Sequence, residues 1–104
     1  MPANPARTPL RKLSVNLFWR VELEEDARRD LHRLGADAAQ KITRYLRTRL
    51  ATAGDPRRFG QSLRGDLHGL WRYRVADYRV LAKIEEQRLL VLVVRVGHRK
   101  NVYD

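Results

Sequence analysis

The sequence contains no cysteine, which excludes disulfide scaffolds, thiol catalysis and thiolate zinc sites. It also lacks any apolar run close to the roughly 18 residues that a membrane-spanning helix needs. The first residues carry several prolines and no apolar core of the kind found in a secretory signal. A reducing compartment is compatible with all three absences, and we expect a cytoplasmic protein.

Acidic residues are also scarce. The chain has 12 Asp and Glu against 22 Lys and Arg, so its formal net charge is +10 over 104 residues. Hydrophobic residues make up 43% of the sequence, which is enough for one packed domain. The charge balance disfavours calcium sites and favours a polyanion such as nucleic acid, or an acidic protein, as the partner.

Residues 1–16 have few apolar side chains and no periodicity. Their prolines and basic residues indicate a flexible basic leader, and an extension without a role is its simplest interpretation. No internal repeat follows. Residues 17–104 are therefore expected to form a single domain.

The first half of this domain predicts one strand and two helices. Residues 17–23 are rich in aromatic and branched side chains, as strands are. Acidic residues then precede apolar side chains at helical spacing up to Gly35, and a second apolar stripe runs from Ala36 to the Gly-Asp-Pro at 54–56. The short gap between the stripes predicts an antiparallel helical hairpin.

From residue 70 the period changes to two, and residues 70–75, 78–85 and 89–98 are interpreted as three antiparallel strands joined by tight turns. The fold class is therefore α+β. It consists of an N-terminal strand, an antiparallel two-helix hairpin and a C-terminal three-strand antiparallel meander against which the helices pack.

The pairing of these strands places arginines together. A two-residue turn at 76–77 puts Arg74 directly opposite Arg79, and a three-residue turn at 86–88 puts Arg95 opposite Arg79 on its other side. The second register continues the apolar face through Leu90, Leu92, Val94 and Val96. The opposite face then carries five arginines: Arg72, Arg74, Arg79, Arg95 and Arg99.

A set of like charges on one sheet face is destabilising unless something neutralises it. An ordinary solvated face is the alternative, but such faces usually alternate in sign, and only Asp77 and Glu85 lie near this one. We therefore interpret it as a polyanion-binding face. The choice of arginine favours nucleic acid as the ligand, because the planar guanidinium group binds phosphate through two hydrogen bonds and stacks on bases.

The histidines His32, His68 and His98 lack metal-ligand spacing, so neither a metal nor a cofactor is expected. A ribonuclease needs neither, because the RNA 2′-hydroxyl attacks the adjacent phosphate while the protein orients the strand, stabilises charge and moves protons. Arginine stays protonated in proteins and supplies only charge. The candidates for proton transfer are Tyr103 and His98, although strand alternation points His98 to the core side, where packing is the alternative role.

The chain resembles the RelE/ParE family of bacterial toxins from type II toxin–antitoxin pairs over residues 19–103. Four segments in this order and spacing carry the resemblance: residues 55–58 (DPRR), 63–65 (LRG), 70–80 (LWRYRVADYRV) and 94–99 (VRVGHR), with Val-Tyr at 102–103 after them. The resemblance implies a RelE-like fold. It also implies an endoribonuclease that cuts mRNA in the ribosomal A site and leaves a 2′,3′-cyclic phosphate and a 5′-hydroxyl.

The family's functional positions can be carried over by this match. Its basic positions on the first meander strand fall on Arg72 and Arg74, its phosphate-contacting arginines on Arg79 and Arg99, and its C-terminal tyrosine on Tyr103. Active members often have lysines at the first two positions, one of them implicated in proton transfer, so the general base is left open here. Further basic residues are expected to contact nucleic acid: Arg64, Lys83, Arg95 and Lys100.

Two other functions remain open. The ParE branch shares the fold but inhibits DNA gyrase and generally lacks the full arginine and tyrosine set, which makes this chain look nearer to RelE. A catalytically inactive module that only docks an acidic protein is the second alternative. Family members are silenced by a small acidic antitoxin, and such a partner agrees with the net charge of +10.

Overall fold

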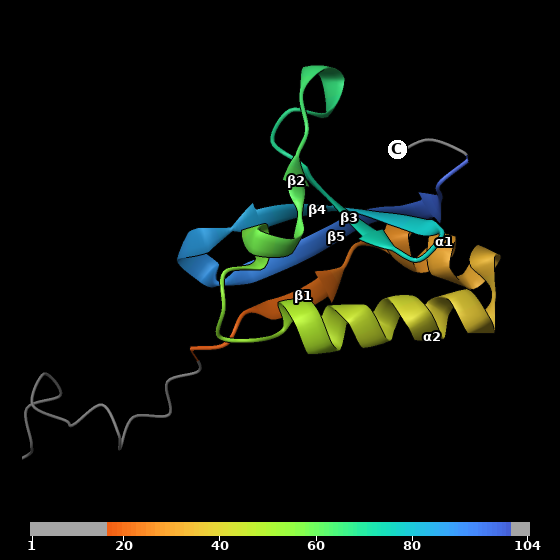
Figure 1. The fold of residues 1–104 in the computed structure, drawn as a ribbon, viewed down its shortest axis with the longest axis horizontal. Helices are drawn as coiled ribbons and strands as arrows, with labels where there is room; N and C mark the ends of the chain where they lie inside the picture. The colour runs from red at the N-terminus through yellow and green to blue at the C-terminus, as the bar shows by residue number, and fades with distance from the viewer. Residues whose placement is uncertain (1–16, 101–104) are drawn as a thin grey trace, which may run out of the picture.

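The computed structural model describes residues 17–100. The expected leader at 1–16 and the C-terminal residues 101–104, with Tyr103, lie outside the described residues. Within the described part, two helices cover one face of a five-stranded sheet, which confirms the α+β prediction (Figure 1).

The helices form the predicted hairpin. Helix α1 (Glu25–Leu34) has two acidic residues in its first turn, where the helix dipole favours negative charge. Gly35, whose φ of 98° suits glycine, joins it to α2 (Ala36–Tyr45), and a wider π-type turn, η3 (Leu46–Leu50), continues α2. The two helices lie side by side in Figure 1.

The strand order in the sheet is β1-β5-β4-β3-β2. Strand β1 (Arg20–Leu23) pairs with β5 (Leu90–His98) in parallel, whereas β3 (Trp71–Val75) and β4 (Tyr78–Glu85) complete the antiparallel meander. These four strands match the expected ones. The edge strand β2 (Gln61–Ser62) is not predicted, because two residues are too few for an alternating pattern.

The hydrophobic core lies between the helices and the sheet. Tyr73 is fully buried in it, and its hydroxyl donates a hydrogen bond of 2.9 Å to the carbonyl of Pro56. Burial raises the pKa of Tyr73, so its hydroxyl stays protonated near neutral pH. The core cluster includes side chains from both layers: Ala27, Leu31, Ile42, Leu46, Leu50, Val80, Val91, Val93 and Val96.

The β3–β4 register agrees with the prediction. Arg74 pairs with Arg79 and Tyr73 pairs with Val80 across a two-residue turn. Ala76 in that turn has a φ of 52°, a left-handed conformation that lets the chain reverse in two residues.

The predicted β4–β5 register is wrong. The turn comprises η6 (Glu86–Arg88) and Leu89, whose φ is 48°, so Glu85 pairs with Leu90. A β-bulge farther along adds a second residue, and Arg95 consequently lies opposite Leu81 while Arg79 lies opposite Gly97. The core face of β5 is therefore formed by valines at 91, 93 and 96, and not by the expected Leu90, Leu92 and Val94.

Candidate nucleic-acid interface

Three arginines of the β3–β4 hairpin lie on the sheet face opposite the helices. Arg74 and Arg79 are directly paired, and Arg72 is two residues before Arg74 on β3, so strand alternation gives all three the same face. We call Arg72, Arg74 and Arg79 the arginine face. The short turn between β3 and β4 fixes their spacing, because a one-residue slip would turn the β3 side chains to the core.

Arg72 is held in an unusual environment. Its side chain is buried, with a residue exposure of 9%, and its Nη2 donates a 2.7 Å hydrogen bond to the neutral amide oxygen of Gln61 on β2. The Nε of Arg72 is buried without a hydrogen-bond partner among the described residues. A buried cation with only a neutral acceptor is costly, and an anion nearby would offset that cost.

Arg79 is also buried and folds back on the turn. Its Nη1 donates to the carbonyls of Ala76 at 3.1 Å and Tyr78 at 2.8 Å. These bonds hold the guanidinium at the β3–β4 turn. Arg74, by contrast, is exposed beside it. The pair thus places one fixed and one exposed guanidinium in the same row of the sheet.

A polar hollow of about 180 Å³ opens beside Arg72 and Arg74. Its other lining residues are Phe59, Gly60 and Gln61, which lead into and begin β2. No local sequence pattern predicts these three residues as part of the site. Their proximity to the arginines depends on β2 pairing with β3, and the Asp-Pro-Arg-Arg segment just before them was the only signal in this region.

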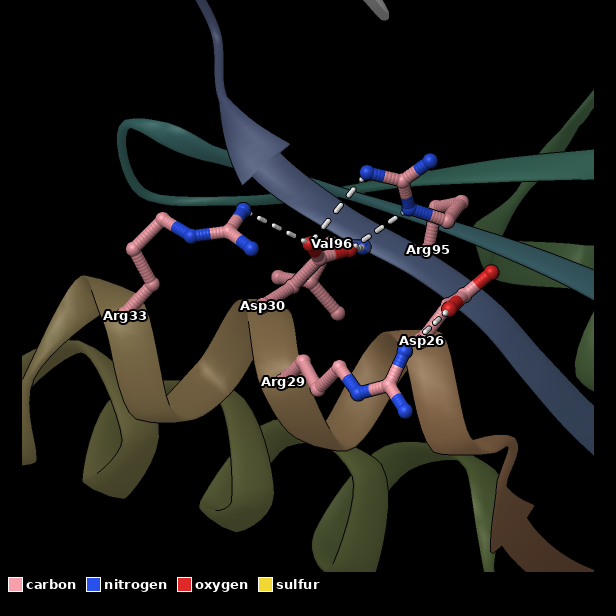
Figure 2. A network of polar contacts seen from close by, with 6 residues as sticks. All are labelled: Asp26, Arg29, Asp30, Arg33, Arg95 and Val96. Atoms are coloured by element: carbon pink, nitrogen blue, oxygen red, sulfur yellow. Dashed lines mark hydrogen bonds and ion pairs between the residues drawn. The ribbon is translucent and has the colours of Figure 1, made fainter.

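Arg95 pairs with Leu81, as Arg72 does, but its guanidinium is bound to α1 (Figure 2). Its Nε and Nη2 donate to the two carboxylate oxygens of Asp30 on α1, at 2.8 and 3.3 Å. Asp30 is buried, also accepts the Val96 N–H at 2.8 Å, and lies 3.4 Å from Arg33. Arg95 is thus neutralised within the chain, which corrects the prediction that it adds uncompensated charge opposite Arg79.

The Asp30 carboxylate is held ionised. Burial opposes its charge, but the hydrogen bonds from Arg95 and Val96 and the nearby charges of Arg95 and Arg33 outweigh this effect and lower its pKa from 3.8. The sequence held a signal for this role. Asp30 is three residues after Ala27 and four before Leu34, so a charged residue interrupts the apolar stripe of α1.

Arg99 lies at the same end of the sheet as the β3–β4 turn. Its backbone N–H donates to the Asp77 carbonyl at 2.7 Å, and its exposed side chain lies 3.6 Å from the Asp77 carboxylate. The structure therefore brings Arg99 near Arg79, as expected, but beside an acidic residue. Because both side chains of this pair are well exposed, water screens it strongly.

The other predicted residues are distributed differently. His98 pairs with Tyr78 on the helix side of the sheet, packs edge-on against its ring at 5.8 Å, and accepts the Lys100 N–H at Nδ1. It is therefore not on the arginine face. Lys83 is exposed on the same face of β4 as Arg79, and Arg64 is exposed in the β2–β3 connection. Tyr103 lies outside the described residues.

Within residues 17–100, no three His, Asp or Glu side chains gather in a way that could hold a metal ion. The same part of the chain contains no helix long and apolar enough to cross a membrane.

Comparison with known proteins decides the family. The family model described as the ParE toxin of the type II toxin–antitoxin system parDE matches residues 21–103. The chain belongs to the RelE/ParE family of type II toxins. It is 32% identical over 85 residues to Toxin RelG of Mycobacterium tuberculosis, covering 82% of this chain and 95% of that protein. It is equally identical to Toxin RelE of the same organism, covering 86% of that protein.

Solved structures agree with this assignment. The toxin in the RelBE2 toxin–antitoxin complex from Mycobacterium tuberculosis matches with a TM-score of 0.73 at 31% identity, covering 81% of this chain and 94% of that one. The archaeal RelE–RelB complex from Pyrococcus horikoshii matches with a TM-score of 0.60 at 23% identity, covering 81% and 98%, which shows the shared fold. Our RelE/ParE toxin thus has the fold that the resemblance implied.

Proposed function

We propose that this RelE/ParE toxin is a metal-free endoribonuclease that cleaves mRNA in the ribosomal A site in the cytoplasm. The observation that carries the proposal is the arginine face, in which buried Arg72 donates to a neutral amide beside Arg74 and Arg79. The chain is 32% identical to toxins named RelG and RelE, which supports an assignment to the RelE branch of the family. The face is suited to holding a phosphate of the RNA backbone.

In the proposed reaction, the 2′-oxygen attacks the adjacent phosphorus and the bond from phosphorus to the 5′-oxygen breaks. A 2′,3′-cyclic phosphate and a 5′-hydroxyl result. The 2′-hydroxyl proton leaves to a base, and a proton is delivered to the 5′-oxygen. Arg72, Arg74, Arg79 and Arg99 stabilise the charge that develops on the phosphate oxygens, which is the largest contribution such a site can make.

Proton transfer is assigned to Tyr103, on the resemblance alone. His98 is a weaker candidate, because its Nδ1 already accepts the Lys100 N–H and it lies on the helix side of the sheet. Arginine cannot act as the base at neutral pH. The buried Tyr73 is equally unsuited, because its pKa is raised.

The proposed partner outside the reaction is a small acidic antitoxin. The related Mycobacterium tuberculosis structure is a toxin–antitoxin complex, and the Pyrococcus horikoshii structure is a RelE–RelB complex. The net charge of +10 favours an acidic partner for this chain. The antitoxin would neutralise the arginine face when it is bound.

Cleavage in a translating cell-free extract tests the proposal, with mRNA 5′ ends mapped. Arg74→Ala is the informative variant because Arg74 is exposed and its loss spares the core. It should lower the cleavage rate by about 100- to 1,000-fold, the usual effect of removing one donor to a developing charge. Arg47, on the helix layer, is also exposed; Arg47→Ala removes the same charge and should cleave normally. Equal rates for the two variants would refute the assignment.

A second candidate function is supported by the family model, which describes a ParE toxin. A gyrase inhibitor would leave mRNA intact and trap gyrase on cleaved DNA. Retained antitoxin binding with neither effect would instead indicate a binding module without activity.

A further inference from the structure

An aromatic ring lies at the hollow beside the arginine face. Phe59 is 37% exposed and lines the hollow together with Gln61, Arg72 and Arg74. Large aromatic side chains are normally buried, so an exposed ring in a polar hollow calls for an explanation. The proposal below rests on the proposed ribonuclease function.

The segment that carries Phe59 is well held. Asp55 accepts the Arg57 N–H at 2.9 Å, and the Arg57 guanidinium lies 3.2 Å from Asp55 and 3.0 Å from Glu86 in the β4–β5 turn. The Tyr73 hydroxyl bonds the Pro56 carbonyl from the core side. Phe59 therefore sits on a short 3-10 turn, η4 (Pro56–Phe59), that is tied to β3 and to the β4–β5 turn.

Gly60 lets this segment approach the sheet closely. A Cβ at position 60 would lie 2.9 Å from the Tyr73 ring, which is closer than real side chains allow. The backbone consequently rests on Tyr73 while the neighbouring Phe59 side chain lines the hollow. This close approach keeps the Phe59 ring near Arg72. The hydrogen-bond partner of Arg72 is Gln61, the residue that follows Gly60.

Two guanidinium groups lie close to the ring. The Cζ of Arg58 lies 4.7 Å from the ring centroid and the Cζ of Arg49 lies 5.6 Å from it, both within cation–π range. An apolar protein partner would have to bury these charges, whereas a nucleotide offers a flat base for the ring and phosphates for the arginines. The surroundings of Phe59 thus select a polyanion with flat, unpaired rings.

We propose that Phe59 stacks on an unpaired nucleobase of single-stranded RNA while Arg72 and Arg74 hold a phosphate of the same strand. The nucleobase stacks on one face of the Phe59 ring, and the exposed guanidinium of Arg58 moves toward the phosphate backbone of the RNA. Stacking of this kind tolerates any base, so Phe59 contributes affinity and positioning of the strand more than base identity.

Binding of a short single-stranded RNA carrying 2′-O-methyl groups, which cannot be cleaved, tests the inference directly. Phe59→Ala should weaken binding by about 5- to 100-fold, the range for losing one stacked base, and leave the salt dependence unchanged. Arg74→Ala should instead reduce the salt dependence, because a phosphate contact is lost. Leu67→Ala, an equally exposed apolar residue outside the hollow, is the matched control and should bind normally.

Two further measurements separate stacking from loss of structure. Phe59→Trp should retain RNA binding, and its emission should be quenched when the oligonucleotide is added. Tripolyphosphate, an anion without a base, should bind the wild type and Phe59→Ala equally. Weaker tripolyphosphate binding by Phe59→Ala would overturn the inference, because the substitution would then have disturbed the arginines.

The outcomes distinguish this inference from the function on which it rests. A wild-type toxin that cleaves mRNA while Phe59→Ala binds RNA and cleaves unchanged would overturn the stacking role alone. A wild-type toxin that neither binds RNA nor cleaves it would remove both. If Phe59→Ala loses only antitoxin affinity, the ring belongs to a protein interface and the inference is wrong.

Discussion

Arg72 and Arg95 lie on neighbouring parts of one sheet and have opposite electrostatic surroundings. Arg95 donates twice to Asp30, a carboxylate that is itself buried and bonded to the backbone of β5. Arg72 donates to a neutral amide, and its Nε has no partner among the described residues. Among residues 17–100, only the first of these two arrangements pairs the guanidinium with a carboxylate, which is why we assign structure to Arg95 and ligand binding to Arg72.

Replacing the neutral partner of Arg72 by an acid should stabilise the fold and lower the activity. Gln61→Glu keeps the shape of the side chain and adds a carboxylate 2.7 Å from a buried guanidinium. We expect unfolding to require about 1 kcal/mol more free energy and RNA cleavage to fall at least about tenfold, because the phosphate would meet a neutralised arginine. Denaturant titration and the cleavage assay measure the two effects.

Gln40→Glu serves as the control for this prediction, since Gln40 is exposed on α2 and the charge change is identical. If both variants lose the same activity, net charge and not the arginine face is responsible.

Asp30 should contribute to stability through ionised contacts with α1 and β5. Asp30→Ala is expected to lower the free energy of unfolding by about 2–4 kcal/mol, since it leaves Arg95 and the Val96 N–H without their shared acceptor. Asp30→Asn should cost less, because its amide oxygen still accepts one bond. Equilibrium unfolding in urea gives both values, and an unchanged midpoint for Asp30→Ala would contradict the role described.

The pH dependence of this contribution follows from its pKa. The folded-state pKa of Asp30 is below 3.8, so its stabilising effect is fully present above that value and is lost as pH falls through the folded pKa. The difference in stability between the wild type and Asp30→Asn should therefore be constant from pH 7 to about 5 and shrink below about 4. A stability difference between the two proteins that grows on acidification would contradict a lowered pKa of Asp30.

At the scale of elements, the β3–β4 hairpin positions Arg74 against Arg79 through a two-residue turn. Ala76 adopts a φ of 52° there, which costs free energy for any residue with a Cβ. Ala76→Gly should therefore raise the free energy of unfolding by about 0.5–1 kcal/mol. The same change in the middle of α2, Ala39→Gly, should lower it by about 1 kcal/mol. Thermal unfolding measures both, and effects of the same sign would contradict the turn geometry.

The sequence predicts those elements whose signals are local. The helices follow from apolar spacing and Gly35, and the β3–β4 register follows from alternation around a short turn. The β4–β5 register depends on a left-handed Leu89 and on a bulge, and neither has a compositional signature. The resulting shift explains why Arg95 was misplaced.

The other features that the sequence does not predict depend on contacts between distant segments. Asp30 and Arg95 are 65 residues apart, and their pairing requires α1 to lie against β5. The hollow with Phe59 and Gln61 likewise exists only because a two-residue strand pairs with β3. Such arrangements depend on the packed fold and not on the local pattern.

At the scale of the molecule, the charge of +10 is spread over more than one surface. The exposed side of α1 carries a second basic group, formed by Arg28, Arg29, His32 and Arg33 around another hollow. Arg29 and Arg33 there have carboxylate neighbours in Asp26 and Asp30 (Figure 2). The arginine face is thus distinguished by the burial of Arg72 and Arg79 and by the neutral partner of Arg72 rather than by charge alone.

NMR titration of the arginine Nε–Hε resonances with uncleavable single-stranded RNA tests the central claim most directly. The account predicts that the signals of Arg72, Arg74 and Arg79 shift with RNA concentration while those of Arg28 and Arg29 stay in place. Shifts confined to the arginines of α1, with the arginine face unchanged, would contradict it.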